Sequence, residues 1–375
     1  MRKYTLLLVL VAVLVPAIVG ANGGGETGPI KIGVAGPHSG DLASFGIPTV
    51  RAAELVAAQI NEAGGLLGRQ IELVIEDDQC DPGIAPNAAA RLVGEEVVAV
   101  VGHICSGATR AALNIYADEN IPAISPSATN PGLTKDGEFP NFFRTIAPDD
   151  AQGELQANFA GAELGVQSVA ILHDGGDYGR GLADFSRASI EAGFPEIEVL
   201  LYEGVTVGAV DYSAIINRVA DSGADAVIFG GYHPEASRLV SQMRTQGIDT
   251  LFISGDGVRD DAFIAVAGDD AEGVYATGPR DTSGNAIANA AVSAHQAAYG
   301  EDPGPFFQEG WAAMLALTSA IEAAGSTDAD AIMDALRGEN VETSVGTISF
   351  DELGDATGVG FAVYQVQGGS YVQVQ

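Results

Sequence analysis

The sequence predicts an α/β protein made of two lobes, each a doubly wound parallel sheet covered by helices. Short apolar runs alternate with amphipathic stretches along most of the chain, and this β-α-β-α order is typical of a parallel sheet with helices on both faces. The alternation restarts near residues 142–148, so the pattern occurs twice. The length of 375 residues also exceeds what one hydrophobic core usually organises.

The first lobe is predicted to begin with an apolar strand at residues 30–35. The stretch 49–63 repeats apolar side chains on one helical face and is followed by Gly64 and Gly65, which favour a helix end. The alternation then continues in the same way. Further strands are expected at residues 71–76, 97–102 and 121–125, and further helices at 86–96 and 108–118.

The second lobe repeats this alternation. Strands are expected at residues 169–173, 197–202, 226–230, 251–254 and 274–278, with helices between them at 182–192, 212–221 and 235–246. The remaining chain is predicted to form helices and then strands, at residues 286–299, 307–324 and 328–336 and at 347–350, 361–367 and 371–374.

This late return of the chain predicts that both lobes are discontinuous. We expect lobe 1 to contain residues 29–147 plus 279–357 and lobe 2 to contain residues 148–278 plus 358–375. Three crossovers near Ala147, Gly278 and Gly358 would then join the lobes, and glycine tolerates the dihedral changes of a hinge. A ligand is expected in the cleft between the lobes.

The N-terminus is predicted to be a secretory signal peptide over residues 1–21. Arg2 and Lys3 precede an apolar run over residues 6–19, and small residues around Ala21 offer a cleavage site. The run is shorter than the roughly 20 residues that span a bilayer, although a retained membrane anchor is the alternative. Export followed by retention behind an outer membrane makes the periplasm the expected compartment.

The predicted export bears on the oxidation state of the two cysteines. Cys80 and Cys105 are the only cysteines, and an oxidising compartment favours one disulfide between them. Two buried free thiols are the alternative. No CxxC or Cys-His spacing suggests a metal site or a catalytic pair.

The charge balance excludes several partners. The chain has 17 Lys+Arg against 50 Asp+Glu, a formal net charge of −33. Such a surface repels nucleic acids and anionic lipids, so no nucleic-acid partner is expected. An acidic soluble protein from a saline environment is one interpretation, and a binder of cations or basic ligands is the other.

Motifs that carry catalysis are missing. The sequence contains no GxGxxG after a strand, no GxxxxGK[ST] and no GxSxG, which argues against a dinucleotide enzyme, a P-loop enzyme and a hydrolase. The five histidines are scattered without metal-binding spacing. We therefore predict no enzyme, no catalytic residue, no metal and no cofactor.

Polar residues recur just after the predicted strand ends, where open α/β sheets bind ligands. They include Ser106, the segment 127–129, Tyr178, Tyr232 and Asp256. Ser106 is expected near a helix N-terminus and would either hold a ligand carboxylate or serve as a plain N-cap. Asp256 would be either a counter-ion for a ligand ammonium or a turn aspartate.

Several of these segments resemble the periplasmic leucine/isoleucine/valine-binding proteins of ABC transporters. The similar segments are Gly-His-Ile-Cys-Ser at 102–106, Ile-Ser-Pro-Ser-Ala-Thr-Asn-Pro at 124–131, Asp-Asp-Gln-Cys-Asp-Pro at 77–82, Ile-Leu-His-Asp at 171–174 with Tyr178-Gly179, and Gly-Gly-Tyr-His-Pro-Glu at 230–235. The likeness runs from about Ile30 to the C-terminus. It implies the type I periplasmic binding protein fold, in which two α/β lobes joined by three crossovers close over an amino acid.

The resemblance also implies roles for single residues. Ser106 and Thr129 correspond to the hydroxyls that hold the ligand α-carboxylate, with help from the backbone of Ser127 and Ala128. Tyr178 and Tyr232 correspond to second-lobe residues of the pocket, and Cys80 with Cys105 corresponds to the family disulfide.

Two positions depart from the family pattern. Phe45 stands where the family often has Tyr or Trp against the ligand side chain. Asp256 stands where the best-known leucine binders have Glu for the ammonium, one methylene longer.

The expected function is therefore that of a periplasmic solute-binding protein, monomeric and without a cofactor. It would capture leucine, isoleucine, valine or a related small amino acid and deliver it to the membrane permease of an ABC importer. A γ-amino acid or an amide-like solute is a further candidate. The alternative is a sensory receptor of the same fold that presents its ligand to a membrane signalling protein.

Overall fold

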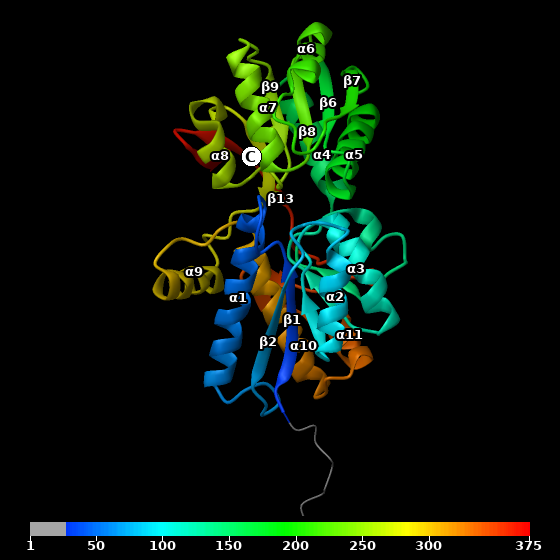
Figure 1. Ribbon diagram of the computed structural model, residues 1–375, viewed down its shortest axis with the longest axis vertical. Coiled ribbons are helices and arrows are strands. Elements are labelled where there is room, and N and C mark those ends of the chain that lie inside the picture. The colour runs from blue at the N-terminus through cyan, green and yellow to red at the C-terminus, as the bar shows by residue number, and fades with distance from the viewer. Residues whose placement is uncertain (1–27) are drawn as a thin grey trace, which may run out of the picture.

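The computed structural model describes residues 28–375 and contains two parallel-sheet units stacked end to end (Figure 1). The predicted signal peptide and its cleavage near Ala21 lie outside the described residues. Among residues 28–375, no helix is long and apolar enough to cross a membrane. The α/β fold class with two doubly wound lobes is confirmed.

The first sheet has five parallel strands in the order β2-β1-β3-β4-β5. Its strands are β1 (Ile30–Gly36), β2 (Ile71–Asp77), β3 (Ala99–Val101), β4 (Ala123–Ser125) and β5 (Phe142–Arg144). Its helices are α1 (Ala43–Glu62), α2 (Ala85–Gly94), α3 (Ser106–Asp118), α9 (Ala286–Tyr299), α10 (Phe307–Ala324) and α11 (Ala329–Gly338). A short η1 helix (Pro131–Leu133) and a β11 (Val341–Thr343)–β12 (Gly346–Ile348) hairpin complete this lobe.

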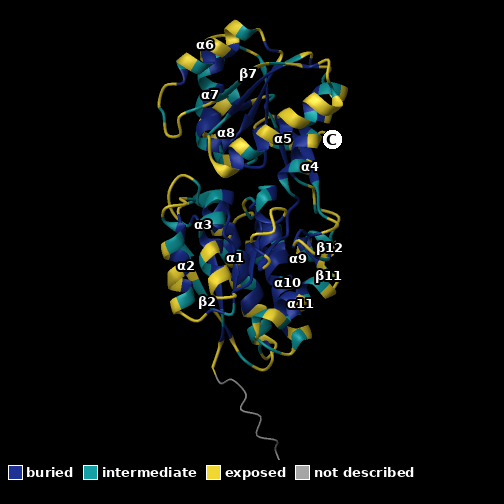
Figure 2. Ribbon diagram, turned by 90° about the vertical axis from the view of Figure 1, so that its right-hand side faces the viewer, coloured by how far each residue is buried: buried dark blue, intermediate teal, exposed yellow. Residues whose placement is uncertain are grey.

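Both faces of this sheet are covered, as a parallel sheet requires. Val101 packs into a core with Trp311 of α10, whereas its neighbour Val100 packs into a second core with Leu113 of α3. Successive strand residues point to opposite faces, so each face contributes one core. Figure 2 shows the buried residues along the sheet between these helix layers.

The second sheet has seven strands in the order β14-β13-β10-β9-β8-β6-β7. Its strands are β6 (Ser168–His173), β7 (Glu198–Gly204), β8 (Ala226–Gly230), β9 (Leu251–Ser254), β10 (Tyr275–Pro279), β13 (Phe361–Gln367) and β14 (Ser370–Gln373). The first five are parallel, and β13 and β14 extend the edge in antiparallel orientation. Its helical segments are α4 (Asp149–Asn158), η2 (Phe159–Glu163), α5 (Asp177–Gly193), α6 (Ser213–Ser222), α7 (His233–Thr245), α8 (Asp261–Ala267) and η3 (Gly268–Ala271).

The chain passes between the two units three times. It leaves the first sheet after β5, returns to its helices after β10, and enters the second sheet again at β13 (Figure 1). The exact lobe boundaries near Ala147, Gly278 and Gly358 stay a prediction.

Two helices, α4 and α8, were not predicted from the sequence, and each has a physical reason. The buried residues of α4 include Asp149, Gln152 and Gln156, so the helix lacks an apolar stripe. Helix α8 has only seven residues and begins where the Asp260 carboxylate accepts a hydrogen bond from the Ala262 N–H at 2.8 Å. Helix α1 also begins earlier than predicted, at Ala43, with Pro48 inside it.

Candidate functional site

The residues predicted from strand ends gather around one cavity between the lobes. The space among them measures about 220 Å³, part of it open to solvent. It is lined by Phe45, Ile104, Ser106, Ser127 and Phe306 from the first unit and by Tyr178, Tyr232, Asp256 and Gly257 from the second. A ligand held here would contact both units at once.

Six of the eight predicted ligand-binding residues line this cavity, and Ala128 and Thr129 do not. Both are fully buried. The Ala128 N–H donates to Ser125 Oγ at 2.9 Å, which engages a backbone donor that the resemblance assigns to the ligand. The Thr129 hydroxyl makes no hydrogen bond of regular geometry within the described residues, although it lies close enough to Asp149 to lower the pKa of that carboxyl.

Ser106 begins α3 at the edge of the cavity. Cys105 is the N-cap residue and makes no side-chain cap, so Ser106 is not the plain N-cap that was one of its two expected roles. Its Oγ accepts a hydrogen bond from the Asn130 N–H at 3.2 Å. The backbone N–H groups of the first helical turn have no intrahelical acceptor and carry the positive end of the helix dipole, which favours a carboxylate at this place.

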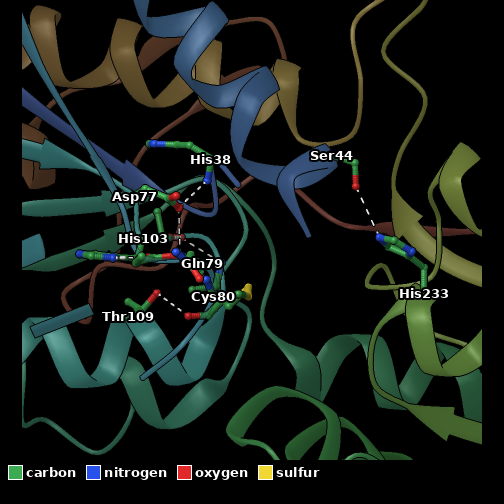
Figure 3. The surroundings of a disulfide bond; sticks show 12 residues. His38, Ser44, Asp77, Gln79, Cys80, His103, Thr109 and His233 are labelled. Carbon is green, nitrogen blue, oxygen red and sulfur yellow. Dashed lines mark hydrogen bonds and ion pairs between the residues drawn. A yellow bond between two sulfur atoms is a disulfide. The ribbon is translucent and has the colours of Figure 1, made fainter. Parts of the chain in front are cut away.

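A buried network holds the loop that carries Ser106 (Figure 3). Cys80 and Cys105 form a disulfide with a Cα–Cα distance of 5.5 Å. Asp78 accepts from the Cys80 N–H at 2.7 Å and contacts His103 Nδ1 at 2.5 Å, and the other His103 ring nitrogen lies 2.9 Å from the Tyr116 hydroxyl. These contacts position the start of α3 before any ligand arrives.

Asp256 lines the same cavity from the second unit, just after β9, and is 3% exposed. Its Oδ1 accepts from the Tyr178 hydroxyl at 2.7 Å and from Gln152 Nε2 at 3.0 Å. The Asp256 N–H donates to Gln152 Oε1 at 3.0 Å, so Gln152 holds both the backbone and the carboxyl of this residue. Burial raises the pKa of Asp256, which makes this carboxylate a receptive partner for a cationic group.

Aromatic rings form the wall between these two polar ends. The Phe45 ring lies 5.3 Å from Phe306 and 6.3 Å from Tyr232, and Tyr232 in turn lies 5.0 Å from Tyr178. Phe306 has φ 59° and precedes α10 directly, a left-handed conformation that is rare for a bulky residue. Sequence reasoning missed Phe306, because nothing local distinguishes it from its core neighbour Phe307.

The two units touch at the rim of the cavity. Arg110 Nε of α3 lies 2.9 Å from an Asp177 carboxylate oxygen of α5, and Asn130 Nδ2 donates to the Asp177 carbonyl at 2.6 Å. On another side, Ser44 of α1 donates to Asp260 at 2.5 Å and faces His233 at 3.4 Å (Figure 3). Side chains of the two units are therefore in direct contact beside the cavity.

A larger cavity, about 1200 Å³ by the same measure and also partly open to solvent, adjoins this site and shares Asp256 and Phe306 with it. Its lining is dominated by charged and polar residues, among them Arg259, Arg280 and Glu309. The smaller cavity is lined by Ser106, Tyr178 and Tyr232, three residues that the sequence pattern places at strand ends, and the larger cavity is not. We therefore assign the candidate site to the smaller cavity.

Two parallel-sheet units with a small cavity between them are typical of a solute-binding protein of the two-lobed kind. The sequence profile of the periplasmic binding protein family matches residues 29–370, and the chain belongs to that family. The homologues of this chain are solute-binding proteins of ABC transporters and not enzymes. The resemblance to leucine/isoleucine/valine-binding proteins is confirmed by relatives over most of the chain.

Similar proteins are known by sequence and by structure. A leucine-, isoleucine-, valine-, threonine- and alanine-binding protein of Pseudomonas aeruginosa is 38% identical over 337 residues, which is 90% of this chain and 89% of that protein. A leucine-binding protein of Thermotoga maritima matches with a TM-score of 0.85 at 29% identity, covering 92% of this chain and 98% of the other. A branched-chain amino acid transporter substrate-binding protein of Streptococcus pneumoniae in complex with isoleucine matches with a TM-score of 0.82 at 30% identity, covering 92% and 100%.

Proposed function

We propose that this protein captures a branched-chain or related small amino acid and delivers it to the membrane permease of an ABC importer. The observation that carries the proposal is that Ser106, at a helix N-terminus of the first unit, and Asp256 of the second unit line one small cavity. An amino acid presents a carboxylate and an ammonium on one carbon, and the two ends of this cavity offer a partner for each. The names of the relatives support the same class of ligand.

Each part of the ligand has an expected partner. The ammonium is held by Asp256, and the carboxylate is held by Ser106 at the start of α3. The family resemblance adds Thr129 and the backbone of Ser127 and Ala128, and these groups reach the ligand only if the segment 127–129 shifts, because Ala128 and Thr129 lie outside the cavity and both backbone N–H groups donate to Ser125 Oγ. The side chain lies against Phe45, Ile104, Phe306 and Tyr232. These aromatic and aliphatic surfaces favour an apolar side chain, because its transfer from water contributes roughly 25 cal/mol per Å² buried.

The protein is expected to act as a monomer in the periplasm after removal of residues 1–21. A membrane permease is the expected partner, because a similar protein is named as the substrate-binding protein of a branched-chain amino acid transporter. Because the ligand is small and enclosed, delivery requires the cavity to open at the permease.

The ligand is testable by releasing what the purified protein carries. Denaturation followed by mass spectrometry should detect leucine, isoleucine or valine. Calorimetry should then show binding of that amino acid and strongly reduced binding of two analogues, leucinamide and 4-methylpentanoate, which lack the carboxylate and the ammonium respectively. Equal binding of 4-methylpentanoate and leucine would contradict the ammonium site, and recovery of a solute without an amino group would contradict the proposal.

Ligand binding is expected to close the protein. We propose that lobe 1 (residues 29–147 plus 279–357) and lobe 2 (residues 148–278 plus 358–375) turn about the crossovers near Ala147, Gly278 and Gly358. A ligand that touches both lobes binds the closed state better and shifts the population towards it. X-ray scattering should therefore show a smaller radius of gyration when the ligand is added. Curves that superimpose with and without a saturating ligand would contradict the hinge.

The rim contacts allow a matched control for closure. Arg110→Ala removes an ion pair between α3 and α5, whereas Arg187→Ala removes a comparable exposed pair to Glu191 within α5. Only the Arg110 variant should enlarge the ligand-free protein and weaken ligand binding, by up to about fivefold, since an exposed pair contributes up to about 1 kcal/mol.

A further inference from the structure

A second buried carboxyl group lies directly behind Asp256. Asp149 is the first residue of α4 and is fully buried. Gln152 lies one turn further along the same helix, and its Nε2 donates to Asp149 Oδ1 at 2.8 Å and to Asp256 Oδ1 at 3.0 Å. One amide nitrogen therefore bridges two buried carboxyl groups that are 107 residues apart in the chain (256 − 149).

Gln152, Thr129 and Arg144 favour the ionised form of Asp149, but they do not outweigh its burial and the charge of Asp256. The Asp149 Oδ2 is buried and makes no hydrogen bond within the described residues. Arg144 of β5 is the cation that favours its ionised form, but the guanidinium already contacts Asp355 at 2.6 Å and donates to the carbonyls of Ala128 and Asn130. Burial and the negative charge of Asp256 raise the pKa of Asp149 well above its usual range.

The groups around the pair add little positive charge. Those on the neighbouring elements are Arg144 of β5, Tyr178 of α5, Tyr232 before α7, Arg259 after β9 and Glu309 of α10. Burial raises the pKa of Tyr178 and Tyr232, which stay neutral phenols. Burial also raises the pKa of Glu309 to about 7, and the Arg259 guanidinium lies over the Tyr364 ring at 3.9 Å.

We propose that Asp149 carries a proton in the ligand-free protein and that an ammonium group bound at Asp256 promotes release of this proton to solvent. Two adjacent buried carboxyl groups cannot both ionise easily, so the pair retains one proton until another positive charge arrives. No covalent bond of the ligand changes. Asp149 acts through Gln152 and through its charge, as a positioning residue that sets the charge of the ammonium site. This inference rests on the proposed function, because it requires a ligand with an ammonium group.

The sign of the pH dependence follows from this linkage. The ammonium lowers the pKa of Asp149, so the ligand-free protein holds its proton to a higher pH than the complex does. Between these two pKa values, binding releases up to one proton, and affinity should rise up to about tenfold per pH unit. Above both pKa values Asp149 is ionised with and without ligand, so its titration should no longer make the affinity depend on pH.

Calorimetry with L-leucine in two buffers of different ionisation enthalpy measures this proton release directly between pH 5 and 9. The wild type should release up to one proton per leucine within this range. In Asp149→Asn the release should disappear there, and any remaining release from Asp256 should move to lower pH because its carboxylate neighbour is gone. Asp150→Asn removes the adjacent acid, which pairs with Lys135, and should release protons as the wild type does. Equal release in the wild type and Asp149→Asn, or no release at any pH, would overturn the inference.

Infrared spectroscopy decides the question without a ligand. At the lower end of the pH range in which calorimetry detects proton release, the ligand-free wild type should show the carbonyl band of a protonated carboxyl group that Asp149→Asn lacks. Absence of this band would overturn the inference even if leucine binds. Failure of leucine to bind a protein that shows the band would instead contradict the proposed function.

Discussion

Replacing Asp256 by alanine should weaken the binding of a zwitterionic amino acid by about 2 to 5 kcal/mol, or roughly 30-fold to several thousand-fold. The carboxylate is 3% exposed and lies in a cavity with an aromatic wall, so the ligand ammonium would be buried without a charged partner. Calorimetry with leucine measures the change. Unchanged affinity would remove Asp256 from the binding site.

Two further variants distinguish the loss of the Asp256 charge from the loss of its side-chain volume. Asp256→Asn keeps the size and removes the charge, and it should lose most of the same binding energy while retaining a partner for Tyr178 and Gln152. Asp269→Asn removes an exposed acid from the same lobe and should bind leucine like the wild type. Thermal melting of each variant shows whether a loss of binding reflects a loss of folded protein.

The combined Ser106→Ala and Thr129→Ala substitutions should weaken leucine binding at least about 100-fold. Each hydroxyl is expected to donate to the ligand carboxylate, and a hydrogen bond to a charged group contributes about 1.5–3 kcal/mol. Neither side chain is an essential part of a core: Ser106 Oγ accepts one hydrogen bond from the Asn130 N–H, and Thr129 Oγ1 has none of regular geometry in the described chain. The double variant should therefore fold.

Two comparisons make this result specific. Ser293→Ala plus Thr245→Ala removes two exposed hydroxyl groups and should leave leucine binding unchanged. The preference of the wild type for leucine over leucinamide should also shrink in the site variant, because the carboxylate has lost its donors. Wild-type affinity in the site variant would place the ligand elsewhere in the cleft.

Much of the architecture could be predicted because half-buried strands and helices space their apolar residues at characteristic intervals in the sequence. Strand β13 occupies residues 361–367 as predicted, and all ten parallel strands except the short β5 were anticipated from apolar runs. Helix α4 was not predicted, because its buried face carries Asp149, Gln152 and Gln156 in place of an apolar stripe. Buried polar side chains are stable only when distant groups pair with them, and local sequence does not reveal those groups.

Some residues of the candidate site could likewise be predicted from the sequence, and others could not. The order of strands and helices places Ser106, Tyr178, Tyr232 and Asp256 at strand ends, and all four line one cavity. The sequence alone thus determined the fold class and the edge of each sheet at which the cavity lies, because the alternation of apolar and polar residues in each strand and helix follows from which side chains face solvent. Only the tertiary structure decided that Phe306 joins the wall and that Gln152 bridges Asp149 to Asp256, because these contacts depend on how separately formed elements pack across the cleft.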